Sequence, residues 1–219
     1  MHEIPTLETG RLRLRPLRAT DIDDYAALYS DRAVLRYLGG GPEPWDRGRA
    51  WRHLAFVMGH WQLRGAGMWA VEHKERGAFL GMTGFAAPDG WPGFELAWTL
   101  APRWWGNGYA TEAAGEALAH AFSTLRMERV ISLIHPENRA SIRVAERIGE
   151  RPRGRMDHLG REMLCYGLDR EAYIREKVGE STSRLLLPHA RPRALKDDGQ
   201  LHELAVHMDE NPPGLRSIP

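Results

Sequence analysis

Hydrophobic residues near the N-terminus recur first with the period of a strand and then with the period of a helix. Between residues 11 and 17 leucines alternate with arginines, which indicates a half-buried strand. Acidic residues follow Thr20, as is typical of a first helical turn, and we expect that helix to reach about Tyr29. Apolar residues at helical spacing predict a second helix over residues 45–63, which the glycines after it should end.

The central part of the chain has the pattern of antiparallel strands joined by tight turns. Short apolar runs over residues 68–72, 79–86 and 94–100 indicate three strands. The connections at 75–77 and 88–90 contain the Gly, Pro and Asp residues that form hairpin turns. We therefore expect these three strands to pair antiparallel.

After Pro102 the pattern changes to helices that alternate with strands. A strand, helix, strand order requires a crossover that leaves the two strands parallel. The sequence therefore predicts an α/β fold of mixed α+β type, with a central mixed sheet that is antiparallel in its N-terminal part and is flanked by helices. The elements expected here are helices over residues 109–125 and 138–148 and strands over residues 129–135, 151–156 and 163–168.

The composition changes after about Val178. The remaining residues carry several prolines among mixed charges, a pattern typical of a terminal tail. We expect a folded domain over residues 1–178 and a proline-rich C-terminal tail or arm over residues 179–219.

Composition and charge narrow the class of protein. The 219 residues are 42% hydrophobic, enough for a packed core, and 30 Lys and Arg nearly balance 29 Asp and Glu. A net charge of +1 gives no broad basic surface for a phosphate backbone, so no nucleic-acid partner is expected. No apolar run reaches the roughly 20 residues of a membrane span, and no basic segment followed by an apolar run begins the chain. We expect a cytoplasmic protein with no membrane partner.

Metal and thiol chemistry have little support in the sequence. The ten histidines do not show the spacing of zinc ligands, so no metal site is expected. Cys165 is the only cysteine, which fits a reducing compartment, and its neighbours Leu164 and Tyr166 favour a buried thiol over a nucleophile.

Two glycines between a strand and a helix indicate an anion-binding turn. Gly106 and Gly108 leave the backbone open to a ligand, and the helix that starts at Tyr109 offers its first unpaired N–H groups. Such a turn suits a pyrophosphate. The Gly-Lys-Ser/Thr ending of a P-loop is absent. A dinucleotide-binding fingerprint fits poorly, because its third small position falls on Thr111 and the strand before it belongs to an antiparallel meander.

The same segment resembles motif A of the GNAT superfamily of acyl-CoA-dependent acetyltransferases, Arg/Gln-x-x-Gly-x-Gly/Ala, when Arg103 is taken as its first residue. Further segments resemble the branch that includes the ribosomal-protein N-terminal alanine acetyltransferases, and the likeness covers about residues 6–175. These segments are LETGRLRLR at 7–15, GMTG at 81–84, ELAW at 95–98 and NRASIRVAERIG at 138–149.

The resemblance implies transfer of an acetyl group from acetyl-CoA, the expected cofactor, to a primary amine by direct attack in a ternary complex. It also implies that two parallel strands splay apart near Leu100, where backbone groups are left free for the cofactor. The cofactor-binding residues that it implies are Leu100, Arg103, Gly106, Asn107, Gly108, Tyr109, Ala110, Thr111, Asn138 and Arg143.

Two residues are expected to take part in proton transfer. The acceptor arrives as an ammonium ion and must lose a proton, for which we select Glu95, acting directly or through water. Many family members seat a tyrosine beside the leaving thiolate, whereas this chain has Ala145 there, and Ser141 is the expected substitute. The chain also departs from the family at Glu150, which follows Gly149 in place of an aromatic residue.

Each of these assignments has a structural alternative. Gly106 and Gly108 could form only a helix entry, and Asn138 could serve as a helix N-cap. Ser141 could be an ordinary first-turn serine, and Glu95 could belong to the polar face of a strand.

The acceptor is less well defined than the cofactor. Tyr37, Trp45 and Trp51 are expected to bind the substrate, with core packing as the alternative for the two tryptophans. Protein or peptide N-termini, free amino acids and aminoglycosides all remain open as acceptors, and a homodimer remains open as the assembly. A CoA-binding regulatory module, or a partner-binding module that acts through its tail, is the alternative to an enzyme.

Overall fold

A single mixed sheet organises the described part of the chain. The computed structural model describes residues 3–38 and 43–185. Eight strands pair in the order β1-β2-β3-β4-β5-β6-β8-β7, and all neighbours are antiparallel except β5 and β6. The expected fold class is confirmed. The strands are β1 (Leu7–Glu8), β2 (Leu12–Arg15), β3 (Met68–His73), β4 (Phe79–Ala86), β5 (Glu95–Leu100), β6 (Arg129–Ile134), β7 (Arg151–His158) and β8 (Arg161–Asp169).

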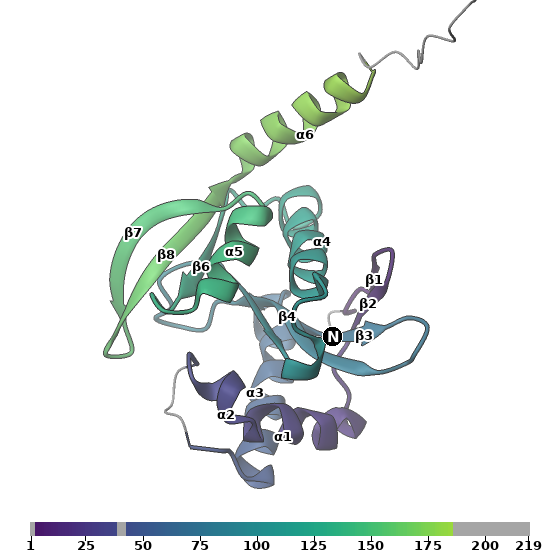
Figure 1. Ribbon diagram of the computed structural model, residues 1–219, viewed down its shortest axis with the longest axis vertical. Coiled ribbons are helices and arrows are strands. Elements are labelled where there is room, and N and C mark those ends of the chain that lie inside the picture. The colour runs from purple at the N-terminus through teal and green to yellow at the C-terminus, as the bar shows by residue number, and fades with distance from the viewer. Residues whose placement is uncertain (1–2, 39–42, 186–219) are drawn as a thin grey trace, which may run out of the picture.

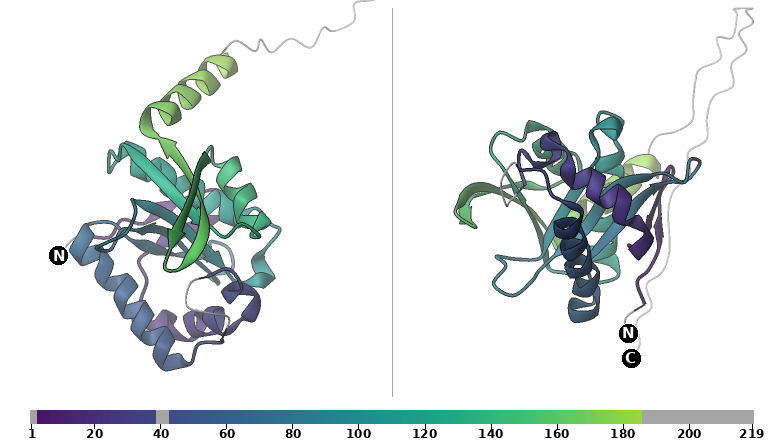
Figure 2. Two further views of the ribbon diagram at one scale, coloured as in Figure 1. Left: turned by 90° about the vertical axis from the view of Figure 1, so that its left-hand side faces the viewer. Right: turned by 90° about the horizontal axis from the view of Figure 1, so that it is seen from below.

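Helices cover both faces of this sheet (Figures 1 and 2). Alternate residues of β3 face opposite sides, with Trp69 and Val71 in the core under α4 and Met68 and Ala70 in the core under α1 and α3. The period-two pattern of the strands thus divides the apolar residues between two cores. The helices are α1 (Ile22–Ser30), α2 (Arg32–Leu35), α3 (Arg47–Arg64), α4 (Tyr109–Ser123), α5 (Arg139–Arg147) and α6 (Arg170–Leu185), and no helix of the described part is long and apolar enough to cross a bilayer.

The parallel pair β5 and β6 is joined over a short length only. Glu95 pairs with Ile131, and the Ile131 N–H donates to the Phe94 carbonyl at 3.0 Å. Beyond that pair the two strands have no further ladder partners, although β5 continues to Leu100. The expected splayed pair is therefore present, and β5 carries a free edge toward its C-terminal end.

Glycines let β4 lie very close to its neighbours. A Cβ atom on Gly81 would lie 2.1 Å from the Thr99 carbonyl oxygen, and one on Gly84 would lie 2.4 Å from the Gly67 carbonyl oxygen. Both glycines have positive φ angles, of 146° and 142°. The GMTG segment is thus explained by close contact between backbones.

The N-terminal hairpin is tied to the start of α4. The Glu112 carboxylate accepts hydrogen bonds from the Thr9 hydroxyl at 2.6 Å and the Arg11 backbone N–H at 2.9 Å, and it forms an ion pair with the Arg11 guanidinium. The Arg11 guanidinium also lies over the Tyr109 ring. These contacts fix the first turn of α4 against β1 and β2.

The structure adds elements that the hydrophobic pattern did not predict. The strand β1 and the helix α2 are too short to show a period, and α6 continues through residue 178 to Leu185. The domain boundary expected at residue 178 therefore falls inside α6, which starts directly after β8. Most of the expected tail, residues 186–219, lies outside the described residues.

Candidate functional site

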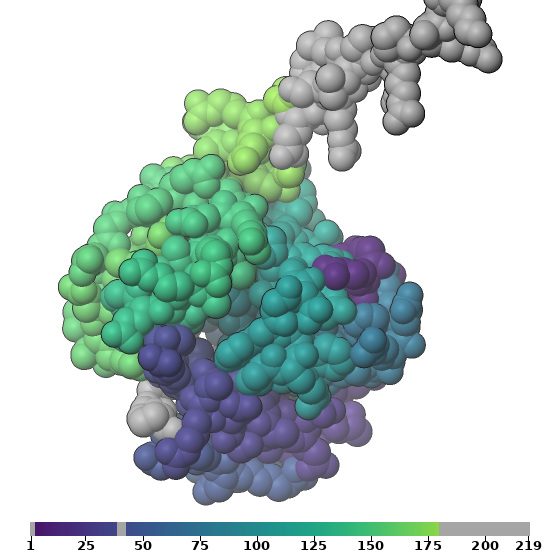
Figure 3. All heavy atoms as spheres, viewed as in Figure 1, coloured from purple at the N-terminus to yellow at the C-terminus, as the bar shows by residue number. Residues whose placement is uncertain are grey.

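A cavity of about 460 Å³ opens at the C-terminal end of β5. Its walls come from four segments that are distant in sequence: α2 with the residues after it, the end of β5, the turn before α4, and α5. Figure 3 shows the surface hollowed where the α2 segment faces α5 and the turn. Ligand sites favour such a position, where strands of a sheet part.

One wall of the cavity is the glycine turn. Gly106 and Gly108 have φ angles of 79° and 78°, and a Cβ on Gly106 would meet nothing within 4 Å. Gly108 is the N-cap of α4 and no side chain caps the helix, so its first N–H groups are left for a ligand. Gly106, Gly108, Tyr109, Ala110 and Thr111 all line the cavity. The turn therefore fits an anionic group such as a pyrophosphate.

The remaining residues of this segment point elsewhere. Asn107 donates its side-chain N–H groups to the carbonyls of Trp104 and Trp105, at 3.2 and 3.0 Å, and so stabilises the turn itself. Arg103 lies in a short 3-10 turn and lines a separate hollow of about 130 Å³ beside Asp24 and Asp31. Neither Arg103 nor Asn107 lines the large cavity, so the cofactor contacts expected of them stay predictions that the cavity does not support.

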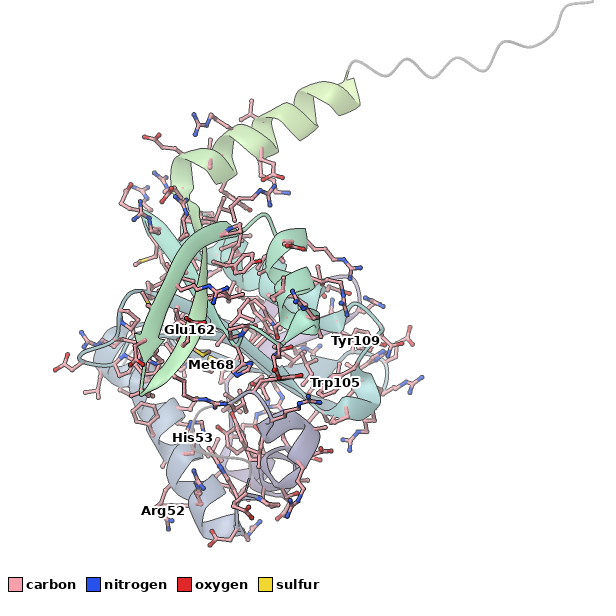
Figure 4. The ribbon with its side chains drawn as sticks, turned by 60° about the vertical axis from the view of Figure 1, so that its left-hand side comes forward. Arg52, His53, Met68, Trp105, Tyr109 and Glu162 are labelled. Carbon is pink, nitrogen blue, oxygen red and sulfur yellow. The ribbon has the colours of Figure 1, made fainter. Side chains whose placement is uncertain are left out.

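Trp105 occupies the place that we expected for Arg103. It lines the cavity, and Figure 4 shows it beside Tyr109 at the start of α4. The motif fits the cavity better when it is counted from Trp105, so that Gly108 and Ala110 are its small positions. The indole Nε1 of Trp105 donates to the Leu100 carbonyl at 2.7 Å. Leu100 lines the cavity as expected, but its carbonyl oxygen already has a partner.

Another wall of the cavity is formed by α5. Asn138 is its N-cap, and the side-chain oxygen accepts from the Ser141 backbone N–H at 3.1 Å. Asn138 and Ser141 also line the cavity, so the capping role and a ligand contact are compatible. Trp98 Nε1 donates to the Ser141 Oγ at 3.3 Å. This leaves the Ser141 hydroxyl hydrogen able to point into the cavity.

Arginines surround the cavity. Arg143, which we selected from the sequence, lines it together with Arg36 and Arg147. Arg147 follows Arg143 by one helical turn, so the i, i+4 spacing would have identified it. Arg36 is the C-cap of α2, and nothing local to its sequence places it opposite α5.

Glu95 lies where β5 and β6 begin to part, away from the cavity lining. Its side chain is 8% exposed and shares a strand face with Thr99, which does line the cavity. The carboxylate accepts from the Trp91 Nε1 at 2.6 Å and from the Leu133 backbone N–H. Burial nevertheless raises the pKa of the Glu95 carboxyl to about 7.

The three expected acceptor-binding residues separate into different places. Tyr37 lines the cavity, with its ring centroid 5.3 Å from that of His135. Trp45 does not line it and is stacked on Tyr29 at 4.4 Å between ring centroids. Trp51 is 60% exposed on α3 and is also outside the cavity lining. For Trp45 the packing alternative fits, whereas the exposed Trp51 is not packed in a core, and its contact with a substrate stays a prediction.

Elsewhere, Cys165 is buried in β8. In the described ranges, no group of three or more His, Cys, Asp or Glu side chains is arranged to hold a metal ion.

Comparison with known proteins identifies relatives over most of the folded part. Residues 11–151 match the family described as "Acetyltransferase (GNAT) domain". The uncharacterized protein YkkB of Bacillus subtilis (strain 168) is 34% identical in an alignment that covers 65% of this chain and 83% of that protein. The uncharacterized N-acetyltransferase YoaA of the same organism is 28% identical over 68% of this chain and 85% of its own length.

Solved structures show the same architecture. An acetyltransferase from Agrobacterium tumefaciens is 32% identical, with a TM-score of 0.68 over 76% of this chain and 95% of its own. The ribosomal L7/L12 alpha-N-protein acetyltransferase RimL in complex with coenzyme A is 18% identical, with a TM-score of 0.65 over 75% of this chain and 98% of its own. At that identity the second likeness concerns the fold alone.

Proposed function

The chain belongs to the GNAT family of acetyltransferases, which are acetyl-CoA-dependent acyltransferases, and we propose that its acceptor is a primary amine of a peptide N-terminus or a small molecule. The observation that carries the proposal is the uncapped start of α4, which opens into the cavity at the splayed end of β5. The turn offers unpaired N–H groups to an anion, and the free strand edge offers backbone groups to an extended chain.

The residues proposed to hold acetyl-CoA are those that line the cavity. The backbone of Gly106, Gly108 and the first turn of α4 would bind the pyrophosphate. Arg143 and Arg147 on α5 would pair with phosphate oxygens, because a guanidinium offers several N–H donors to one anion. When bound, acetyl-CoA supplies the thioester whose acetyl group is transferred.

Ser141 is proposed to stabilise the leaving sulfur. Its Oγ accepts from Trp98, so the hydroxyl hydrogen is available to donate to the thiolate. Asn138 holds the Ser141 backbone, which fixes the direction of that side chain.

Glu95 is proposed to take the proton from the acceptor ammonium group. Because burial raises its pKa to about 7, the carboxylate and the acid are both populated near neutral pH, as a general base requires. It does not line the cavity, so we propose that a water molecule on the Thr99 side of β5 carries the proton to it.

The test combines binding with turnover. Thermal shift with acetyl-CoA should raise the melting temperature, because a ligand of the folded state stabilises it. Thiol release is then measured against peptides with free N-termini, the same peptides with blocked N-termini, free amino acids and aminoglycosides. Release with free but not blocked amines supports the proposal. Binding without release from any amine would favour a regulatory CoA-binding module, and no binding would refute the site.

A further inference from the structure

Glu150 is a buried carboxyl group that the proposed reaction does not use. Its side chain is 0% exposed, and it stands directly after Gly149, where family members commonly have an aromatic residue. Its Oε1 lies 3.0 Å from the Ser132 Oγ, while its Oε2 has no hydrogen-bond partner among the described residues. A buried carboxyl group in this setting requires an explanation.

The hydrogen bonds around Ser132 determine which group donates. The Ser132 Oγ lies 2.7 Å from the Leu96 carbonyl oxygen as well as 3.0 Å from Glu150. A hydroxyl has one hydrogen, so Ser132 can donate to only one of these two oxygens at a time. We assign that hydrogen to the Leu96 carbonyl, because this contact is the shorter one and the carbonyl oxygen can only accept, whereas a carboxyl group can also donate. The contact between Ser132 and Glu150 is then a hydrogen bond only if the Glu150 carboxyl carries a proton and donates it.

This chain of hydrogen bonds stands at the point where the sheet opens. Glu95 and Ile131 form the last paired position of β5 and β6, and Leu96 and Ser132 are the next residues of each strand. The side chain of Ser132 therefore joins the two strands where the backbone ladder has ended. Glu150 contacts the same Ser132 hydroxyl from the connection between α5 and β7.

We propose, on the basis of the proposed function, that Glu150 is a positioning residue for acetyl transfer. In its neutral form it holds the Ser132 hydroxyl on the Leu96 carbonyl and so fixes the opening between β5 and β6. Glu95 lies at the apex of that opening, and the edge of β5 that faces the cavity starts from it.

The charges around Glu150 support the neutral form. In the described ranges no cationic side chain contacts its carboxyl oxygens. Burial, with a further contribution from the Glu95 charge, raises the pKa of Glu150 to about 8. Among the titratable or charged groups on the elements around it are Glu95 on β5, Arg129 on β6, Glu146 on α5, Arg151 and Arg153 on β7, Cys165 and Asp169 on β8, and Glu176 on α6.

These cations are already engaged elsewhere. The Arg151 guanidinium donates to the Glu150 backbone carbonyl at 3.1 Å, and Arg129 and Arg153 both pair with Asp169. Ionisation of Glu150 would turn the Ser132 hydrogen toward the new carboxylate and release Leu96. It would also place a second negative charge near Glu95.

The first test reads the proton on the ligand-free protein. Infrared difference spectra at pH 7 compare the wild type with Glu150→Gln, and Glu128→Gln serves as a control because Glu128 is exposed. We expect the carbonyl stretch of protonated, buried carboxyl groups in the wild type and the control, and in Glu150→Gln a decrease that leaves only the contribution of Glu95, which is itself partly protonated at pH 7. An unchanged spectrum would overturn the proposal.

The second test reads the pH dependence of kcat/KM. Gln at position 150 still donates to Ser132 but cannot ionise, so Glu150→Gln should remove a wild-type decline above about pH 8. Glu150→Leu cannot donate, and it should lower kcat roughly 10- to 100-fold at pH 7 with little change in CoA affinity. Superimposable profiles for the wild type and Glu150→Gln would overturn the proposal. If the wild type transferred no acetyl group, the proposed function would fail, whereas the infrared result is obtained without turnover.

Discussion

Gly81→Ala should disturb the site because its new methyl group collides with the backbone of the neighbouring strand β5. The new Cβ would lie 2.1 Å from the Thr99 carbonyl oxygen and 2.7 Å from the Leu100 Cα, whereas real Cβ contacts essentially never fall below 3.0 Å. Both obstacles are backbone atoms of β5, so no rotamer change relieves them. Strands β4 and β5 must separate by about 1 Å at the Gly81–Leu100 pair.

The cost has two parts. A non-glycine residue at a φ angle of 146° adds backbone strain of about 1–3 kcal/mol. Overpacking against a fixed neighbour adds about 1–3 kcal/mol more. We therefore expect the free energy of unfolding to fall by about 2–6 kcal/mol, which is a large part of the ~5–15 kcal/mol typical of a domain.

Gly154→Ala is the matched control. Gly154 also has a strongly positive φ angle, 129°, but a Cβ there would meet nothing within 4 Å. It should therefore show the strain without the collision. The difference between the two variants, about 1–3 kcal/mol, measures the close approach of β4 and β5.

Urea unfolding followed by tryptophan fluorescence gives the two free energies. Calorimetry with CoA under folding conditions then tests the site, because Thr99 and Leu100 line the cavity. We expect weaker CoA binding by Gly81→Ala and wild-type binding by Gly154→Ala. Equal losses of stability in the two variants would show that the strands do not need this glycine for contact.

The other predictions concern chemistry, charge and ligand binding. Glu95→Gln should lower turnover by about 10²-fold or more with unchanged CoA affinity, and Glu128→Gln should do neither; a wild-type rate for Glu95→Gln would remove that residue from the mechanism. Burial raises the pKa of Glu95 to about 7 and the pKa of Glu150 to about 8, whereas both carboxyl groups lose their protons near pH 4.5 in the unfolded chain. Between these values the folded protein binds more protons than the unfolded chain, so the free energy of unfolding falls as the pH rises from 4.5 to the folded pKa of each group. Urea unfolding between pH 5 and 8 should therefore show that the free energy of unfolding depends less steeply on pH in Glu95→Gln and in Glu150→Gln than in the wild type, with a difference in slope of at most about 1.4 kcal/mol per pH unit. Parallel plots of that free energy against pH for the wild type and a variant would contradict the raised pKa of the substituted residue. Gly108→Trp should abolish CoA binding in calorimetry while Gly108→Ala, with only the strain of its φ angle of 78°, keeps much of it; equal affinities would place the pyrophosphate elsewhere. Arg147→Ala should weaken CoA binding with a smaller loss at high salt, and a loss independent of salt would argue against a phosphate contact.

Local patterns were enough for the regular elements. Strand β4 has the predicted bounds, Phe79–Ala86, and α3 starts and ends within two residues of its prediction. The end of α3 follows from Gly65, which adopts the left-handed conformation with a φ angle of 68°. In these places the deciding interactions lie within a few residues, so a single sequence contains them.

Helix α6 shows where that reasoning fails. Its Arg, Glu and Lys residues are good helix formers but give no clear apolar period, and the start of the helix is held in place by Ala172 and Tyr173, which pack on the core under α4. Propensity and periodicity do not include that contact.

The candidate site divides in the same way. Gly106 and Gly108 could be assigned from the sequence because a positive φ angle and an uncapped helix start are local properties. The direction of the Arg103 side chain depends on the 3-10 turn that carries it, and the sequence pattern did not reveal that turn. The contribution of Arg36 depends on the packing of α2 opposite α5.

The sequence by itself determined the family of the chain, the order of most of its elements and the glycine turn before α4, because each depends on short stretches with fixed spacing. Only the tertiary structure decided that the Trp105 indole donates to the Leu100 carbonyl and that Glu95 lies where β5 and β6 begin to part. It also decided that Glu150 contacts Ser132, through which we propose that it supports the opening between the two strands. These arrangements join residues between 5 and 36 positions apart, across two strands, a turn and the connection between α5 and β7. Burial, which sets the protonation of both carboxyl groups, exists only after those segments have packed together.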